Sequence, residues 1–328
     1  MRKLKDVGER WIVNYINSTL KRLPETVLPI GDDAVDLTAS GKLLLSVDMM
    51  VQCTDIPDGM SWRDVGYRAV TGTTSDIASK GGEPIAYLTS LALPPEMDVE
   101  DFKELWRGIM EAVEIYQGVV IGGDTNTGTQ VIIDVVCIAK ASGRTIPRSG
   151  AKPGDIVAVT GLFGAHAAGL HALLNKIDNP IRDRVVERMI RPIARVKEGR
   201  ILASFASASI DSSDGLAESL YLLSEASNIG FRIDNPPIDP LAVEYAEKTG
   251  VELFDLIFYG GEEYELVVTI PKEQWTTAYR EVEKSGGKLI EIGYVINEPK
   301  VIEVFWNNEY TRLSRRGYLH FTNYSRLR

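Results

Sequence analysis

Strand-like and helix-like stretches alternate along both halves of this chain of 328 residues. Residues 42–49 and 85–93 are apolar runs of strand length, and residues 131–138 form the most β-rich run of the sequence. Residues 99–116 carry apolar side chains at helical spacing, and a capping pattern at Ser61 opens a second helical stretch that runs towards residue 80. Because such elements pack as helices layered on sheets, the pattern predicts an α/β or α+β fold.

A segment rich in glycine, proline and basic residues, 142–154, is the best candidate for a linker. The second half restarts with a strand at 155–160, continues with a run of helical segments, and adds a strand at 264–270. A helix at 272–284 and two short strands complete it. We therefore expect two domains, residues 1–146 and residues 147–328, each long enough to bury a core.

Charge, hydropathy and cysteine content each exclude some classes of protein. There are 46 acidic residues against 36 lysines and arginines, for a net charge of −10, whereas a nucleic-acid binder usually presents a basic face. No apolar run approaches the roughly 20 residues that a membrane span needs. Two cysteines, Cys53 and Cys137, are too few for a disulfide framework or a zinc site. We expect a cytoplasmic enzyme without nucleic-acid or membrane partners.

The common catalytic signatures are missing from the sequence. It has no Gly-x-x-x-x-Gly-Lys-Ser/Thr phosphate loop, no Gly-x-Gly-x-x-Gly fingerprint, no Gly-x-Ser-x-Gly elbow and no protein-kinase motif set. Its three histidines show no metal-binding spacing.

Aspartates instead recur beside small residues, at positions that we interpret as strand ends. They are Asp32, Asp33, Asp48, Asp76, Asp124, Asp211 and Asp214. Mg²⁺ is held by a few carboxylates plus substrate phosphates, and small neighbours let phosphates approach the backbone. Crowded carboxylates also need cations to offset their repulsion. The group predicts a multi-magnesium phosphate site if it converges in space, although any one of these aspartates taken alone is more typical of a turn or a helix N-cap.

The order of these motifs resembles the thiamine-monophosphate kinase family over essentially the whole chain. The matching strings are Gly31-Asp32-Asp33-Ala34, Ser46-Val47-Asp48, Ser75-Asp76-Ile77-Ala78, Gly122-Gly123-Asp124-Thr125, Ser213-Asp214-Gly215-Leu216 and Gly260-Gly261-Glu262-Glu263-Tyr264-Glu265-Leu266. Each string alone is weak evidence, but the ordered set is specific.

The resemblance implies an N-terminal α/β domain whose strands pair across a homodimer into a β-barrel, followed by an α+β domain that completes the active site. It implies that ATP and several Mg²⁺ ions bind, and that the γ-phosphoryl group passes directly to thiamine monophosphate to give thiamine diphosphate. This agrees with the predicted phosphate site, because phosphoryl transfer depends mainly on positioning and charge neutralisation.

The resemblance also implies roles for individual residues. The metal ligands would be Asp33, Ser46, the backbone carbonyl of Val47, Asp48, Asp76, Asp124, Asp211 and Asp214. Gly123, Asp124, Arg148 and Ser213 would bind the ATP phosphates, and Tyr116 would contact the nucleotide. Asp124, Asp214 and Arg148 would be the catalytic residues, and Asp55, Glu262 and Tyr318 would bind substrate.

The sequence departs from the family at Asp55, where a histidine that contacts the substrate is usual. A carboxylate cannot replace an imidazole beside a substrate phosphate without a metal or a proton. Two alternatives therefore stay open: a superfamily relative that uses ATP to activate another small-molecule oxygen, and a catalytically silent, metal-stabilised binding protein.

Overall fold

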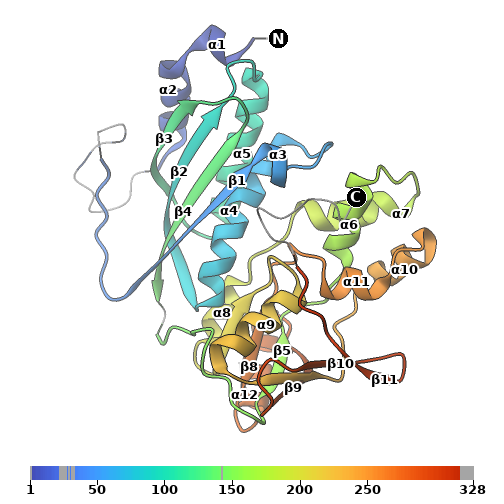
Figure 1. The fold of residues 1–328 in the computed structure, drawn as a ribbon. Helices are drawn as coiled ribbons and strands as arrows, with labels where there is room; N and C mark the ends of the chain where they lie inside the picture. Colours follow the sequence, from blue (N-terminus) through green and yellow to red (C-terminus); the bar gives the residue numbers. More distant parts are fainter. Residues whose placement is uncertain (1, 22–27, 29, 31–33, 142, 318–328) are drawn as a thin grey trace. The chain divides into compact units, whose positions relative to one another are not determined.

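The computed structural model describes residues 2–21, 28, 30, 34–141 and 143–317. The chain divides into two compact units (Figure 1). Unit 1 contains Met1–Ile77 and Glu83–Ala141, and unit 2 contains Ala78–Gly82 and Ser142–Arg328. Asp32, Asp33 and Tyr318 lie outside the described residues.

Unit 1 is a four-stranded sheet with helices. Its elements are α1 (Leu4–Val7), α2 (Glu9–Thr19), β1 (Leu43–Val51), α3 (Gln52–Asp55), α4 (Trp62–Ser79), β2 (Gly82–Leu93), α5 (Val99–Ile115), β3 (Val120–Thr127) and β4 (Ile132–Ala141). The strand order is β1-β4-β2-β3, with β1 antiparallel to β4 and β2 parallel to β3. The sheet is open within the described residues.

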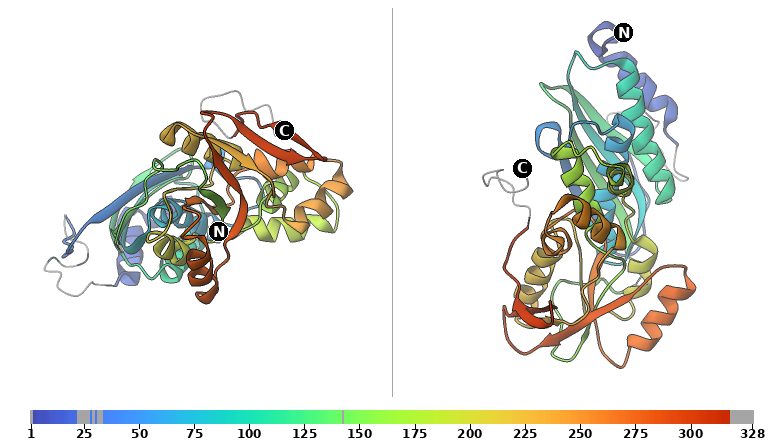
Figure 2. Two further views of the ribbon diagram at one scale, coloured as in Figure 1. Left: turned by 90° about the horizontal axis from the view of Figure 1, so that it is seen from below. Right: turned by 90° about the vertical axis from the view of Figure 1, so that its right-hand side faces the viewer.

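Helices α4 and α5 lie on one face of this sheet (Figure 2). The apolar face of α5 is fully buried, as its helical spacing predicts; for example, Phe102, Leu105 and Ile109 have no exposed surface. The two helices approach closely at glycines, because a Cβ on Gly108 would lie 1.8 Å from the carbonyl oxygen of Arg63. Among the residues of unit 1 that the structure describes, no helix covers the other face of the sheet (Figure 1).

Unit 2 is built on a seven-stranded mixed sheet. Its elements are β5 (Ile156–Val159), α6 (Ala165–Leu174), α7 (Ile181–Ile190), α8 (Val196–Leu202), β6 (Ala208–Asp211), α9 (Leu216–Ser227), β7 (Gly230–Ile233), α10 (Pro240–Thr249), α11 (Leu253–Phe258), β8 (Leu266–Ile270), α12 (Trp275–Lys284), β9 (Ile290–Ile296), β10 (Ile302–Trp306) and β11 (Glu309–Arg312). The strand order is β11-β10-β7-β9-β5-β8-β6, and only the β7–β10 pair is parallel.

The central strands of unit 2 are buried on both faces, which explains their continuous apolar sequences. Val157 and Val159 of β5 face a core that includes α9, whereas Ala158 faces a second core that includes α8 and α12. Val267 and Val268 of β8 divide between the two cores in the same way.

The predicted strands and helices are confirmed. The structure also contains the helices α1, α2 and α3, which were not predicted, and it differs from the prediction in three further respects. First, the stretch predicted to be helical after residue 161 contains the strands β6 and β7. Each has four residues, which is too few to show the two-residue period of a strand. Second, β11 was not expected, because all its residues are exposed. Third, β3 continues through Gly122 and Gly123 to Thr127, beyond the strand end that we expected at Asp124, because these glycines allow close pairing with β2. A Cβ on Gly123 would lie 1.9 Å from the carbonyl oxygen of Thr89.

Candidate active site

In unit 1 the structure brings together two of the predicted metal ligands, Ser46 and Asp76. The hydroxyl of Ser46 on β1 donates a 2.6 Å hydrogen bond to Oδ2 of Asp76 on α4. Because side chains alternate along a strand, Asp48 shares the face of β1 that carries Ser46, whereas Val47 lies on the opposite face. Three oxygen-bearing side chains, from one strand and one helix, thus belong to one side of the sheet.

Asp124 does not join this group within unit 1. It lies on β3, which two strands separate from β1, so three spacings of about 4.8 Å each divide the strands. Its Oδ1 accepts the backbone N–H of Thr125 at 2.9 Å. Among the described residues, no three carboxylate, histidine or cysteine side chains gather closely enough to hold a metal ion.

The interpretation of these aspartates as strand-end residues is wrong for three of them. Asp48 and Asp124 lie inside strands, and Asp76 lies in a helix. The glycine that precedes Asp124 fits close strand pairing, not a turn. Of the five aspartates of this group that the structure describes, Asp211 alone ends its strand, β6, and Asp214 lies in the turn that leads into α9.

In unit 2 the turn that carries Asp211, Ser213 and Asp214 is joined to the segment 260–265 by backbone hydrogen bonds. The N–H of Glu262 donates to the carbonyl oxygen of Ser213 at 2.6 Å, and the N–H of Tyr264 donates to that of Ser212 at 3.0 Å. A Cβ on Gly261 would lie 2.3 Å from the Ser213 carbonyl oxygen, so glycine permits this approach. The predicted metal ligands and the predicted substrate residue Glu262 are therefore neighbours.

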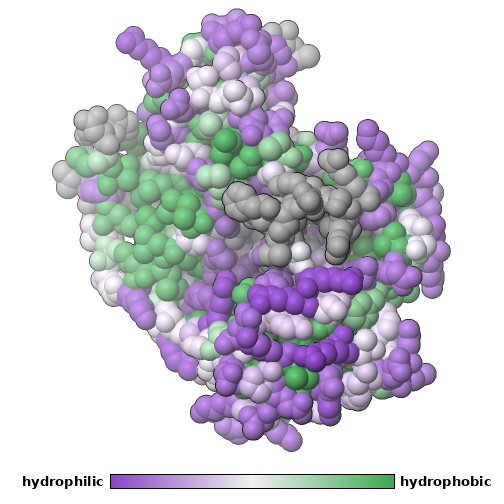
Figure 3. Space-filling view, in the orientation of Figure 1, coloured by the Kyte–Doolittle hydropathy of each residue, from purple (hydrophilic) through white to green (hydrophobic). Residues whose placement is uncertain are grey.

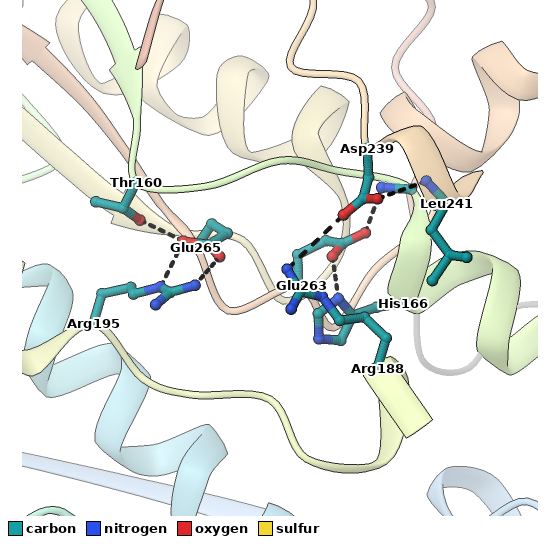
Figure 4. Close-up of polar contacts among 9 residues, drawn as sticks. Thr160, His166, Arg188, Arg195, Asp239, Leu241, Glu263 and Glu265 are labelled. Carbon is teal, nitrogen blue, oxygen red and sulfur yellow. Dashed lines mark hydrogen bonds and ion pairs between the residues drawn. The ribbon is translucent and has the colours of Figure 1, made fainter. Parts of the chain in front are cut away.

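The backbone of Glu262 and of Tyr264 is left-handed, with φ of +66° and +54°. Such conformations in non-glycine residues cost about 1–3 kcal/mol each and occur most often at functional sites. Between and after them, Glu263 and Glu265 are buried with their carboxylates in polar contacts (Figure 4). Sequence reasoning missed these two glutamates, because three of the four residues in 262–265 are glutamates and the string does not indicate which carboxylates are buried.

The remaining predicted residues of the described chain are spread over both units. Asp55 ends the short helix α3, and its Oδ2 accepts the backbone N–H of Val51 at 2.7 Å. Tyr116 follows α5, is 6% exposed, and its hydroxyl lies 3.1 Å from that of Thr71. Arg148 is exposed in unit 2. A role for each of them in binding stays a prediction.

The two cysteines differ in environment. Cys137 lies on β4 opposite Ser46, and burial raises the pKa of its thiol to about 12, so the thiol stays protonated. Cys53 is exposed. The difference follows from their elements, because β4 is buried at Cys137, whereas α3 has no buried residue.

Comparison with models of known protein families identifies the class of protein to which the chain belongs. The AIR synthase related protein, N-terminal domain family matches residues 31–141, and the AIR synthase related protein, C-terminal domain family matches residues 152–305. The two matches cover the sheet of unit 1 and all of the unit 2 sheet except the end of β10 and β11. The mixed α/β fold with two domains is therefore of the AIR synthase type.

Individual relatives narrow the class. The thiamine-monophosphate kinase of Pyrococcus horikoshii is 37% identical over 245 residues, which cover 74% of this chain and 78% of that protein. The thiamine-monophosphate kinase of Bacillus subtilis is 34% identical over 315 residues, or 89% and 93% of the two chains. A solved structure described as AaThiL complexed with AMPPCP and TMP has a TM-score of 0.77 at 29% identity, covering 98% of this chain and 99% of that one. The chain belongs to the thiamine-monophosphate kinase family, which confirms the resemblance of its motifs.

Proposed function

We propose that this protein is an enzyme that transfers the γ-phosphoryl group of ATP directly to thiamine monophosphate, giving thiamine diphosphate. The observation that carries the proposal is the complete set of acidic motifs in a chain that belongs to this family over most of its length. One solved relative is described as complexed with AMPPCP and TMP, which fits an ATP-dependent kinase.

The donor groups suit Mg²⁺, because they are carboxylates and one hydroxyl, the oxygen ligands that this ion prefers. The hydrogen-bonded pair Ser46–Asp76 and the turn at Asp211–Asp214 are the parts of the described chain that fit it best. The proposed ligands are Asp33, Ser46, Val47, Asp48, Asp76, Asp124, Asp211 and Asp214. When bound, Mg²⁺ would neutralise phosphate charge during transfer.

The chain's own residues then bind and orient the reactants. We assign the phosphates of ATP to Gly123, Asp124, Arg148 and Ser213, and a nucleotide contact to Tyr116. Asp124, Asp214 and Arg148 would act at the reacting phosphates, since a fixed charge pattern is the main contribution that a protein makes to phosphoryl transfer. Residues 1–146 would provide the ATP, metal and dimer contacts, and residues 147–328 would complete the site.

We assign the thiamine moiety to Glu262 and Tyr318, because a carboxylate and an aromatic ring both attract a cationic ring. Asp55 has a local role in addition to its proposed substrate contact, since its carboxylate already accepts the N–H of Val51. This bond stabilises the start of α3 and provides a structural reason for an aspartate at the position where the family usually has histidine.

We propose a homodimer in which the strands of two unit 1 sheets pair into a barrel. Leu45, Val47 and Met49 project from one face of β1 and are exposed hydrophobic side chains. Val136 and Ile138 of β4 lie opposite Val47 and Leu45 and are only partly buried. Figure 3 shows hydrophobic residues gathered over this sheet. A second copy would cover this surface, and exposed patches of this kind mark association sites.

We place the enzyme in the cytoplasm. Both cysteines are free, as a reducing compartment would keep them. No helix among the described residues is long and apolar enough to cross a membrane.

An acceptor panel tests the proposal. The purified protein is incubated with ATP and Mg²⁺ and with thiamine monophosphate, thiamine or no acceptor, and ADP release is followed. We expect ADP release that depends on thiamine monophosphate. Equal release with every acceptor, or none with any, would contradict the proposal and favour the relative with another acceptor or the silent binder.

A further inference from the structure

The segment 260–266 of unit 2 holds an unfavourable backbone conformation next to the predicted metal-binding turn. Glu262 and Tyr264 are both left-handed although neither is glycine. Backbone of this kind persists only where the surrounding structure fixes it. The question is therefore which side chains hold Glu262 in place.

The first such side chain is Glu263, whose carboxylate has no exposed surface. Its Oε1 accepts the backbone N–H of Gly164 at 2.6 Å, and its Oε2 contacts Nδ1 of His166, as Figure 4 shows. Gly164 precedes α6 with φ of +104°, so the carboxylate ties the segment to a loop that only glycine forms easily.

The second is Glu265, which is also buried. Its Oε2 accepts the hydroxyl of Thr160 at 2.7 Å and Nε of Arg195 at 2.8 Å, and its Oε1 accepts Nη2 of the same arginine. The carboxylate fills the space beside Gly161, where a Cβ would lie 2.2 Å from Oε1. Both glutamates therefore anchor the segment to the loop 160–166 (Figure 4).

On its other side the segment is fixed to the turn before α9 by three backbone hydrogen bonds. Two are the bonds described above, from Glu262 to Ser213 and from Tyr264 to Ser212. In the third, the N–H of Ser212 donates to the carbonyl oxygen of Glu265 at 2.9 Å. Glu262, which is partly exposed, thus lies between two buried anchors and the predicted metal ligands.

We propose that Glu263 is a positioning residue that holds Glu262 in its binding orientation, with Glu265 as the second anchor. This rests on the proposed function, in which Glu262 binds the thiamine moiety. A buried carboxylate is a weak source of stability, because well-packed apolar residues often replace buried charges without loss. Orientation of the neighbouring residue is the role that a carboxylate with one directed hydrogen bond and one close histidine contact fills and an apolar side chain of the same size does not.

The test compares Glu263→Leu with Glu263→Gln. Leucine keeps the volume but removes both contacts, whereas glutamine still accepts the N–H of Gly164 and can bond to His166 in its other tautomer. We expect Glu263→Leu to raise KM for thiamine monophosphate at least tenfold with kcat within threefold, as loss of binding that is equal in ground and transition states requires. Glu263→Gln should stay within threefold for both.

A double-mutant cycle separates positioning from general damage. In a Glu262→Ala background, Glu263→Leu should change KM less than twofold, because the group that it positions is gone. If Glu263→Leu does not fold, His166→Phe removes one of the two contacts and should raise KM in the same direction. Glu303→Leu is the matched control, because it makes the same replacement at another glutamate of unit 2, one that accepts two bonds from Arg232. Glu303 lies on β10, which three strands separate from β8, so the KM of this variant should equal that of the unchanged protein.

Amide hydrogen exchange gives a readout without turnover. Glu263→Leu should speed exchange in the peptide 260–266, and Glu263→Gln should not. An unchanged KM together with unchanged exchange in Glu263→Leu, or additive KM changes in the double mutant, would overturn the inference. Absence of product from the unchanged protein would refute the proposed function, while the exchange data would still decide the role of Glu263.

Discussion

Replacing Leu45 with glutamate tests the proposed dimer surface. Leu45, Val47 and Met49 are 66%, 61% and 60% exposed, on one face of a strand whose opposite face is turned to the helical side. Full burial of such a side chain stabilises by about 1.5–3 kcal/mol, so covering each exposed part contributes about 1–2 kcal/mol. The six side chains of a two-fold pair would contribute roughly 6–12 kcal/mol, a substantial share of what association needs.

The substitution removes one leucine from each subunit, so the dimer loses about 2–4 kcal/mol. At about 1.4 kcal/mol per tenfold, the dissociation constant should rise about 30- to 700-fold, and burying two like charges would weaken the dimer further. Sedimentation equilibrium at several protein concentrations measures this constant directly.

Ile115→Glu is the matched control, since Ile115 is 49% exposed on α5, a helix of the layer that covers the other face of the sheet. It should leave the dimer intact. A monomeric unchanged protein, an undisturbed dimer in Leu45→Glu, or dissociation caused by Ile115→Glu would refute the reasoning.

Three further predictions concern other parts of the chain. Asp214→Asn should lower kcat/KM for thiamine monophosphate by about 100-fold or more, because it removes one carboxylate of the proposed metal site that neutralises phosphate charge during transfer. The circular dichroism spectrum should stay unchanged, and full activity would contradict the metal-site proposal. Burial lowers the pKa of His171 below its usual 6.5, so the unfolded chain binds a proton more readily than the folded chain. The contribution of His171 to stability should therefore be complete above pH 6.5 and be lost as the pH falls below it. In His171→Gln, the Tm should change less between pH 7.5 and pH 5.5 than in the unchanged protein. In native protein a thiol reagent should modify Cys53 only, and Cys137 should react only after unfolding, since its pKa is about 12.

Periodicity in the sequence was sufficient to predict the long elements. The apolar spacing of α5 and the apolar runs of β4 and β8 each reflect a face, or two faces, that the fold buries. The strands β6 and β7 were not predictable in this way, because a strand of four residues contains only two repeats of the two-residue period. Their identity depends on pairing with distant strands, which local pattern does not encode.

For the site, the residue types and their order were predictable, but the local geometry was not. Small neighbours made Asp124 look like a turn residue, whereas Gly123 is required by contact with Thr89 in the paired strand. The four-residue string at 262–265 gave no sign of which glutamate faces the solvent. Only the left-handed backbone and the partners of Glu263 and Glu265 separate the anchors from the partly exposed Glu262.

The most direct test of the central claim is product formation. Purified protein, ATP, Mg²⁺ and thiamine monophosphate are incubated, and thiamine diphosphate is measured by chromatography against reactions that lack enzyme or contain a chelator. We expect thiamine diphosphate that depends on the enzyme, on ATP and on the metal ion. Recovery of unchanged thiamine monophosphate, with ATP intact or with its γ-phosphoryl group transferred to another acceptor, would contradict the assignment.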